Sequence, residues 1–104
     1  MAKYLLAYTG GSTPEGEQEQ AAVMQAWTAW FTQLGAAVVD PGNPCGGSTR
    51  LGPDGTVSSG APSALTGYSI ISADGLDAAT AAAKGCPVLH HGGAVEVYET
   101  FDVM

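Results

Sequence analysis

The sequence contains few cationic side chains. Lys3, Arg50 and Lys84 stand against ten acidic residues, which gives a formal net charge of −7. A protein that neutralises nucleic-acid phosphates or binds an anionic membrane needs a basic stripe, and three scattered cations cannot form one. We therefore expect no nucleic-acid partner and no membrane partner.

Cysteines and long apolar runs are also scarce. Cys45 and Cys86 lack CxxC spacing, so we expect free thiols in a reducing, cytoplasmic compartment and no metal site. No apolar segment approaches the roughly 20 residues that span a bilayer, and the N-terminal MAKYLLAYTGG is expected to be a strand rather than a signal peptide. No phosphate-binding loop and no GxSxG motif is present, so we expect neither a nucleotide cofactor nor a hydrolase triad.

Apolar residues, in contrast, are abundant. They make up 45% of the 104 residues, and only 12% of the residues are charged. A chain of this length can bury one core, so residues 1–104 are expected to form a single domain. The low surface charge that follows from this composition also indicates that a partner covers part of the surface.

Hydrophobic periodicity predicts the secondary structure. Strands are expected at 3–9, 36–40, 65–74 and 94–103, with a small hairpin at 48–60 that turns at GPDG. A first helix, capped by Ser12 or Thr13, is expected to end at Gly35, and a second to run from Asp74 to Gly85. The first helix carries an apolar stripe with Trp30 at its edge: Val23, Met24, Trp27, Phe31 and Leu34.

This order of elements predicts an α+β fold of ferredoxin-like β-α-β-β-α-β type, with both helices on one face of an antiparallel sheet. The opposite face of the sheet is then solvated or covered. Because the strands are apolar and share four tyrosines between the two faces, we expect a second subunit to cover it in a homodimer. The alternative is a monomer with a half-polar sheet.

The order of several segments resembles a known family. KYLLAY, MQAWTAWFTQLG and VVDPGNP are followed by LTGYSIISADGLDAATAAAKGCP and a closing GGAVEVYE. Together they resemble the YCII-related (DGPF-domain) family of small bacterial proteins over nearly the whole chain. The resemblance implies a dimeric α+β barrel of ferredoxin-like subunits. Most members of the family have no assigned biochemistry; a few are associated with lyase or dehydrochlorinase chemistry on aromatic-ring breakdown products, and others with regulation linked to sigma factors.

The chain departs from the family pattern at two places. Trp27 occupies the position where many members carry a histidine that is proposed to work with an aspartate. SSGAPSA, residues 58–64, replaces the DGPF stretch. The His–Asp pair is therefore not carried over intact.

Two residues are candidates for catalysis. Asp40, at the end of an apolar strand, would be a general base beside a cleft, and its alternative role is to start the rigid turn D-P-G-N-P. His90 would supply a proton, and its alternative is an exposed loop before the last strand.

Aromatic residues are the candidates for ligand binding. Trp27, Tyr8 and Tyr68 would line a cleft for a flat apolar ligand between the first helix and the sheet, although a helix stripe with Trp27 is also typical of a core. We thus expect a binding protein for a small apolar or aromatic ligand. If it is an enzyme, we expect cofactor-free acid/base lyase or isomerase activity in which His90 or Tyr68 donates the proton. The alternative is a non-catalytic regulatory or protein-interaction domain.

Overall fold

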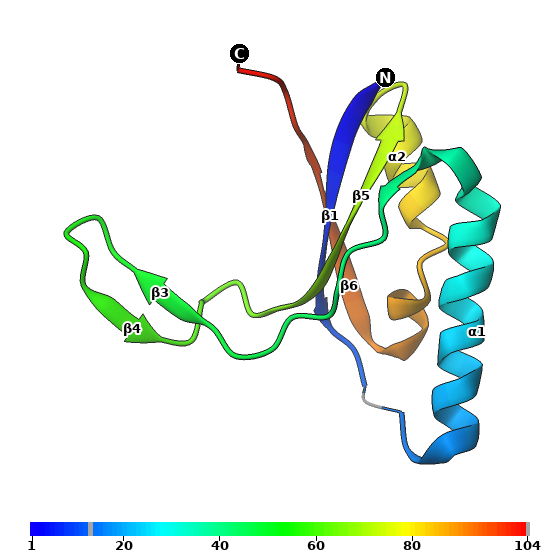
Figure 1. Ribbon diagram of the computed structural model, residues 1–104, viewed down its shortest axis with the longest axis horizontal. Coiled ribbons are helices and arrows are strands. Elements are labelled where there is room, and N and C mark those ends of the chain that lie inside the picture. The colour runs from blue at the N-terminus through cyan, green and yellow to red at the C-terminus, as the bar shows by residue number, and fades with distance from the viewer. Residues whose placement is uncertain (13, 104) are drawn as a thin grey trace.

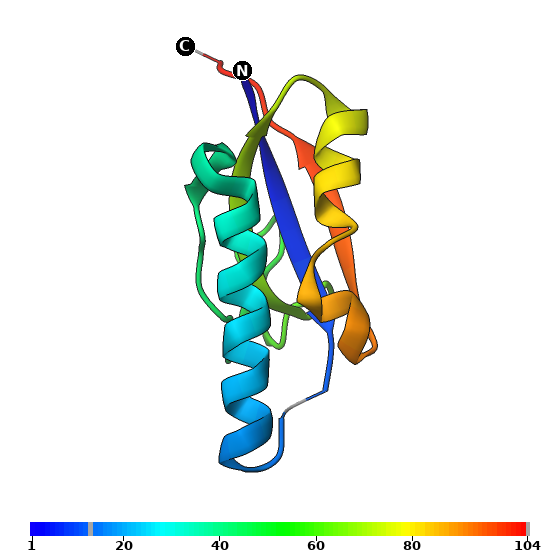
Figure 2. The same cartoon turned by 90° about the vertical axis from the view of Figure 1, so that its right-hand side faces the viewer.

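The computed structural model describes residues 1–12 and 14–103, which form two layers (Figures 1 and 2). An antiparallel sheet in the order β2-β5-β1-β6 consists of Val38–Asp40, Leu65–Ala73, Ala2–Gly10 and Gly93–Glu99. Helices α1 (Gly16–Leu34) and α2 (Leu76–Ala83) cover one face of this sheet. The predicted α+β class is confirmed, and the architecture is compatible with a ferredoxin-like fold.

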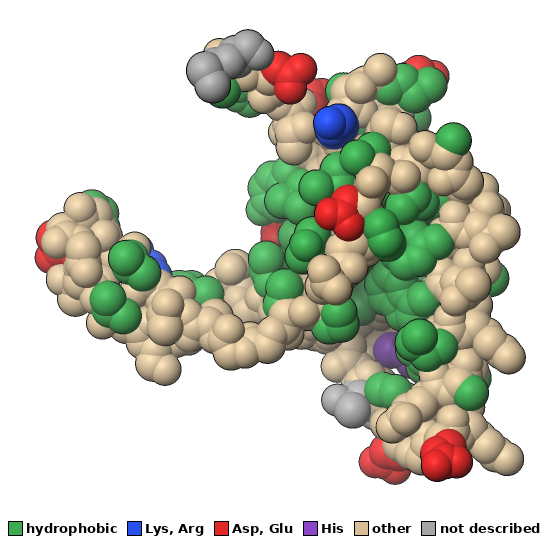
Figure 3. All heavy atoms as spheres, in the orientation of Figure 1, with side chains coloured by type: hydrophobic (Ala, Val, Ile, Leu, Met, Phe, Trp, Pro, Cys, Tyr) green, Lys and Arg blue, Asp and Glu red, His purple; other side chains and the backbone are tan. Residues whose placement is uncertain are grey.

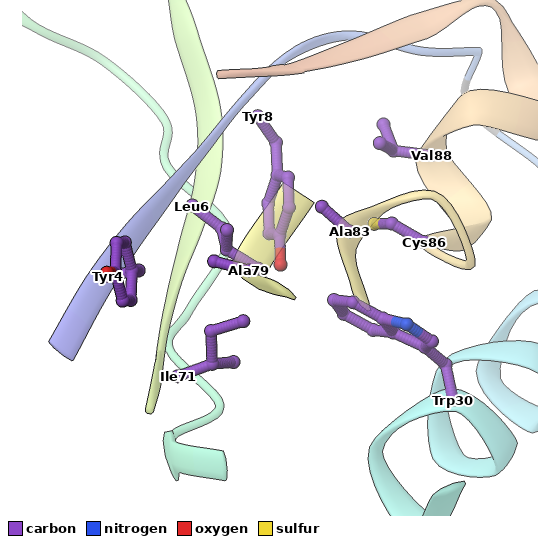
Figure 4. Packing of buried hydrophobic residues seen from close by; sticks show 9 residues of the cluster. All are labelled: Tyr4, Leu6, Tyr8, Trp30, Ile71, Ala79, Ala83, Cys86 and Val88. Carbon is purple, nitrogen blue, oxygen red and sulfur yellow. The ribbon is translucent and has the colours of Figure 1, made fainter. Parts of the chain in front are cut away.

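The core lies between the sheet and the helices. Alternate residues of a strand point to opposite faces, so Tyr4, Leu6 and Tyr8 of β1 all point toward the helices and are buried. On β5, Ser69 and Ile71 are fully buried on the same face. The alternation predicted for residues 65–72 is therefore observed. Figure 4 shows how these strand side chains meet residues of the two helices and of the segment after α2.

The position predicted for Trp30 in the helix stripe was wrong. Instead of lying at its edge, Trp30 is the one residue of α1 that is buried, while Met24 of the predicted stripe is 67% exposed. The reason is the position of α2, because the Trp30 Nε1–H donates a hydrogen bond of 3.1 Å to the Ala82 carbonyl oxygen. The sequence of α1 alone does not show on which side the second helix packs.

The start of α1 also differs from the prediction. Glu15 occupies the N-cap position, and its backbone N–H donates to the Glu19 carboxylate at 3.1 Å. Ser12 is not the cap, because α1 begins only at Gly16; its backbone N–H donates to the His91 carbonyl oxygen at 2.8 Å. Thr13, the other predicted cap, lies outside the described residues. The predicted end at Gly35 is confirmed: φ is 58° there, and the N–H donates to the Phe31 carbonyl oxygen.

The remaining element boundaries shift by a few residues. A 3-10 turn, η1 (Gly35–Ala37), replaces the first part of the predicted strand 36–40. Helix α2 has Gly75 rather than Asp74 at its N-cap, and β6 ends at Glu99 rather than at residue 103. The segment before β6 is a 3-10 helix, η2 (Pro87–His91), where a loop was the alternative expectation for His90. Pro87 and Val88 anchor η2 because both are buried.

Strands β3 (Thr49–Leu51) and β4 (Val57–Ser59) form the predicted hairpin, which we call the arm, residues 48–60. It extends away from the body on the side opposite the helices (Figure 1). We call that side of the main sheet the open face. It carries Leu5 and Ala7 of β1, Tyr68 and Ile70 of β5, and Glu96 and Tyr98 of β6. Figure 3 shows hydrophobic side chains gathered over the sheet between the arm and the helices. Among residues 1–12 and 14–103, no helix is long and apolar enough to cross a bilayer.

Candidate functional site

A groove of about 440 Å³ lies between α1 and the beginning of β5. The segment 41–44, which follows β2, forms its outer wall. The lining is mainly apolar and comes from three parts of the chain: Val23, Met24, Trp27, Thr28 and Phe31 of α1; Pro41, Gly42, Asn43 and Pro44; and Tyr8 with Thr66, Gly67 and Tyr68 of the sheet. This is the cleft between the first helix and the sheet that the sequence predicts.

Trp27 forms the helical wall of the groove. Its ring meets the Tyr8 ring edge-on, with centroids 5.3 Å apart, and lies 5.8 Å from the ring of Phe31. Trp27 and Phe31 are each partly exposed, whereas Trp30, three residues after Trp27, is buried. The sequence left open whether the aromatic residues of this helix belong to the core or to a ligand cleft. Trp30 belongs to the core, and Trp27 presents a ring surface to the groove.

Asp40 fixes the outer wall by starting a turn. Its Oδ1 accepts the Gly42 N–H at 2.8 Å, and Gly42 has a φ of 77°. A side chain at Gly42 would overlap the Tyr68 carbonyl oxygen, so glycine is required by both the backbone conformation and the lack of space. The chain then follows β5, because the Tyr68 N–H donates to the Asn43 carbonyl oxygen at 3.3 Å.

A buried chain of hydrogen bonds connects this wall to the core. The Tyr8 hydroxyl donates to Ser69 Oγ at 2.7 Å, and the Ser69 hydroxyl donates to the Pro41 carbonyl oxygen at 2.6 Å. Burial raises the pKa of the Tyr8 phenol well above its usual value, and burial likewise raises the pKa of the neighbouring Cys86 thiol. These groups are therefore neutral and structural at physiological pH. Within the described residues, no buried side-chain nitrogen or oxygen lacks a partner.

The structure brings together some of the predicted site residues and not others. Tyr8, Trp27 and Tyr68 all line the groove. Asp40 is half-buried beside it, but its carboxylate is engaged in the turn and does not belong to the lining. His90 lies on η2, is exposed and is not part of the lining. The arrangement therefore offers aromatic surface and polar backbone groups to a ligand, and no carboxylate or histidine.

Sequence reasoning missed several residues of the groove. Phe31 and Met24 were assigned to the helix stripe only, yet they lie four residues after and three before Trp27 and so share its face. Pro41 and Pro44 were identified as turn residues without a binding role. Their signal was present, because two prolines and a positive-φ glycine after an edge strand make a rigid wall. In the described part of the chain, no group of three or more His, Cys, Asp or Glu residues could hold a metal ion. Both cysteines are free, Cys45 being exposed and Cys86 buried.

Comparisons with known proteins do not identify the chain. No protein-family model matches it, and neither a search of curated proteins nor a search of solved structures finds a match. The resemblance to the YCII-related family stays a prediction that depends on the quoted segments alone.

Proposed function

We propose that this chain is a YCII-like binding protein that takes a flat apolar or aromatic molecule into the groove between α1 and β5. The observation that supports this most directly is the exposed face of Trp27, framed by Tyr8, Phe31 and the prolines of the outer wall. Aromatic and apolar walls with a few polar backbone groups are typical of small-molecule sites. Because the lining holds no cation or carboxylate, the preferred ligand is uncharged.

We further propose that ferredoxin-like subunits pair through their open faces into a cytoplasmic homodimer of dimeric α+β barrel type. The support is the apolar character of that face. Tyr98 is 52% exposed there, and Leu5 pairs with Tyr98 on one side and with Ile70 on the other. A contiguous apolar surface of this kind is usually covered in a stable protein. The free cysteines fit a reducing compartment.

Binding without turnover is the form of the proposal that we favour over acid/base catalysis. A cofactor-free lyase or isomerase would require a base that faces the ligand, and the Asp40 carboxylate accepts the Gly42 N–H instead. Tyr68, the other predicted proton donor, is a strand residue of the lining, but its side chain belongs to the open face of the sheet, away from the helices. The enzyme hypothesis therefore predicts that Asp40→Asn removes an activity, whereas the binding hypothesis predicts unchanged affinity.

A second candidate is a protein-interaction domain. It is favoured by Met24, which lines the groove and is nevertheless 67% exposed. Flexible methionine side chains adapt to varied apolar partners, so an apolar side chain of another protein would fit the same groove.

The test of the binding proposal is a titration with naphthalene-sized neutral aromatic compounds, followed by chemical shifts of the tryptophan side-chain N–H groups. Thr28→Phe places a ring inside the groove, because Thr28 is an exposed lining residue of α1. The matched control is Thr32→Phe, which adds the same ring at an exposed position of α1 outside the lining. We expect Thr28→Phe alone to weaken binding at least about tenfold. Equal affinity in both variants would place the ligand elsewhere, and no binding to the wild type would favour the interaction domain.

A further inference from the structure

The arm is a regular two-stranded hairpin whose strands are not buried against the rest of the subunit. All residues of β3 and β4 are exposed, and Leu51 and Val57, which face each other across the hairpin, are 64% and 62% exposed. The arm closes at its base, where the Gly60 N–H donates to the Ser48 carbonyl oxygen at 2.9 Å. A two-stranded hairpin is at best marginally stable alone in water, so an arm with an exposed apolar pair requires a surface to rest on.

A hollow of about 550 Å³ lies at the other end of the sheet, near both chain termini. Its lining includes three acidic residues, Asp74, Glu99 and Asp102, and two positive groups, the Lys3 side chain and the Met1 amino group. The Glu99 carboxylate accepts a hydrogen bond from the Tyr4 hydroxyl at 3.4 Å, on the helix side of the sheet. Its wall includes Phe101, which is 77% exposed. Figure 1 shows the arm leaving the body at one end of the open face and the two termini at the opposite end.

We propose that the arm of each subunit docks into this hollow of a second copy of the chain. In that position Arg50 faces the carboxylates of Asp74 and Asp102, while Leu51 and Val57, on the opposite face of the hairpin, cover Phe101. The inference rests on the proposed open-face dimer and adds the part of the partner that the arm contacts.

The choice of this arrangement follows from symmetry and charge. Two open faces can meet about a two-fold axis that runs along the strands or across them. An axis along the strands brings the two arms to the same end, so that both Arg50 side chains lie near each other. An axis across the strands brings each arm to the acidic end of its partner. The arm carries Arg50 and Asp54, so it has no net charge of its own. The second arrangement places Arg50 against carboxylates of the partner, whereas the first places it near the other Arg50.

The experiment is sedimentation equilibrium of the full chain and of charge variants. Arg50→Glu and Asp102→Arg should each weaken the dimer about tenfold, and their combination should restore it to within about threefold of the wild type. Glu17→Arg is the matched control, because it makes the same charge change at an exposed position of α1. It should leave Arg50→Glu unrescued, and a rescue by Glu17→Arg would overturn the specific pairing.

Deletion of the arm tests the docking independently of charge. Replacing residues 49–59 by Asn-Gly joins Ser48 to Gly60 through a two-residue turn, and the hydrogen bond that closes such a turn already exists between them. We expect the dissociation constant to rise at least about tenfold. A dimer that Ile70→Glu on the open face disrupts, but that arm deletion leaves unchanged, would overturn the docking and keep the proposed dimer. A monomeric wild type would overturn both.

Discussion

Gly42→Ala tests how the outer wall of the groove is built. Gly42 has a φ of 77°, in a region that costs an alanine about 1–2 kcal/mol. The added methyl group would also overlap the Tyr68 carbonyl oxygen, which is backbone and cannot rotate away. The turn therefore has to move, and the charge-assisted hydrogen bond to Asp40, worth about 1.5–3 kcal/mol, is lost. Together these effects predict a loss of about 3–5 kcal/mol in the free energy of unfolding, a large share of the about 5–15 kcal/mol of a typical domain.

The measurement is urea unfolding together with thermal unfolding. A loss of this size lowers the midpoint by about 15–25 °C in a domain of this length. Gly46→Ala is the matched control, because Gly46 lies in the same loop with no atom within 4 Å of an added methyl group and no positive φ. It should change the free energy of unfolding by less than about 0.5 kcal/mol. If Gly42→Ala were as stable as Gly46→Ala, the close contact between this turn and β5 would be refuted.

Three further predictions concern the buried groups behind the groove. Ser69→Ala leaves both the Tyr8 hydroxyl and the Pro41 carbonyl without a partner and should lower the free energy of unfolding by about 2–4 kcal/mol. Tyr8→Phe removes one donor and should lower it by about 1 kcal/mol. Equal losses in the two variants on urea unfolding would contradict the chain of hydrogen bonds. Because burial raises the pKa of the Tyr8 phenol and of the Cys86 thiol, the unfolded chain loses these protons first, at its ordinary values near 10.0 and 9.0. The free energy of unfolding should be constant below about pH 8 and should fall at higher pH, by up to about 1.4 kcal/mol per pH unit for each group. In Tyr8→Phe the free energy of unfolding should fall less steeply with pH. The same pH dependence in Tyr8→Phe and in the wild type would argue against a neutral buried phenol. Finally, a thiol reagent at pH 8 should modify Cys45 at once and Cys86 only after unfolding, and rapid modification of both would show that the core opens readily.

Strand pattern was the most informative property of this sequence. Residues 67–72 alternate between buried and half-buried positions, and the period of two assigned each of these side chains to the correct face. The hairpin at 49–59 was equally predictable, because PDG within a short polar stretch fixes a turn locally. These features depend on neighbours in sequence, so the sequence alone contains them.

Features that depend on distant partners could not be predicted in the same way. Ser12 was expected to cap α1, but the helix begins only at Gly16, and the Ser12 N–H instead binds the carbonyl oxygen of His91, 79 residues later. Trp30 was placed at the edge of the stripe because the position of α2, whose Ala82 accepts its N–H, is set by the whole sheet. A groove lies between helix and sheet, where a cleft was expected, but its outer wall was not expected, since that wall exists only because segment 41–44 pairs with β5.

The outer wall of the groove and the core share residues, so only some lining positions can change without a loss of stability. Pro41 supplies both lining surface and the carbonyl that accepts the Ser69 hydroxyl, and Tyr8 presents its ring to the groove and its hydroxyl to Ser69. Changes at these positions alter stability and shape together. Thr28 and Met24 on α1 are exposed lining residues that hold no part of the core. Ligand preference is therefore expected to be adjustable at those two positions with little change in folding free energy, and exchanging Met24 for other apolar residues should change affinity more than it changes the unfolding midpoint.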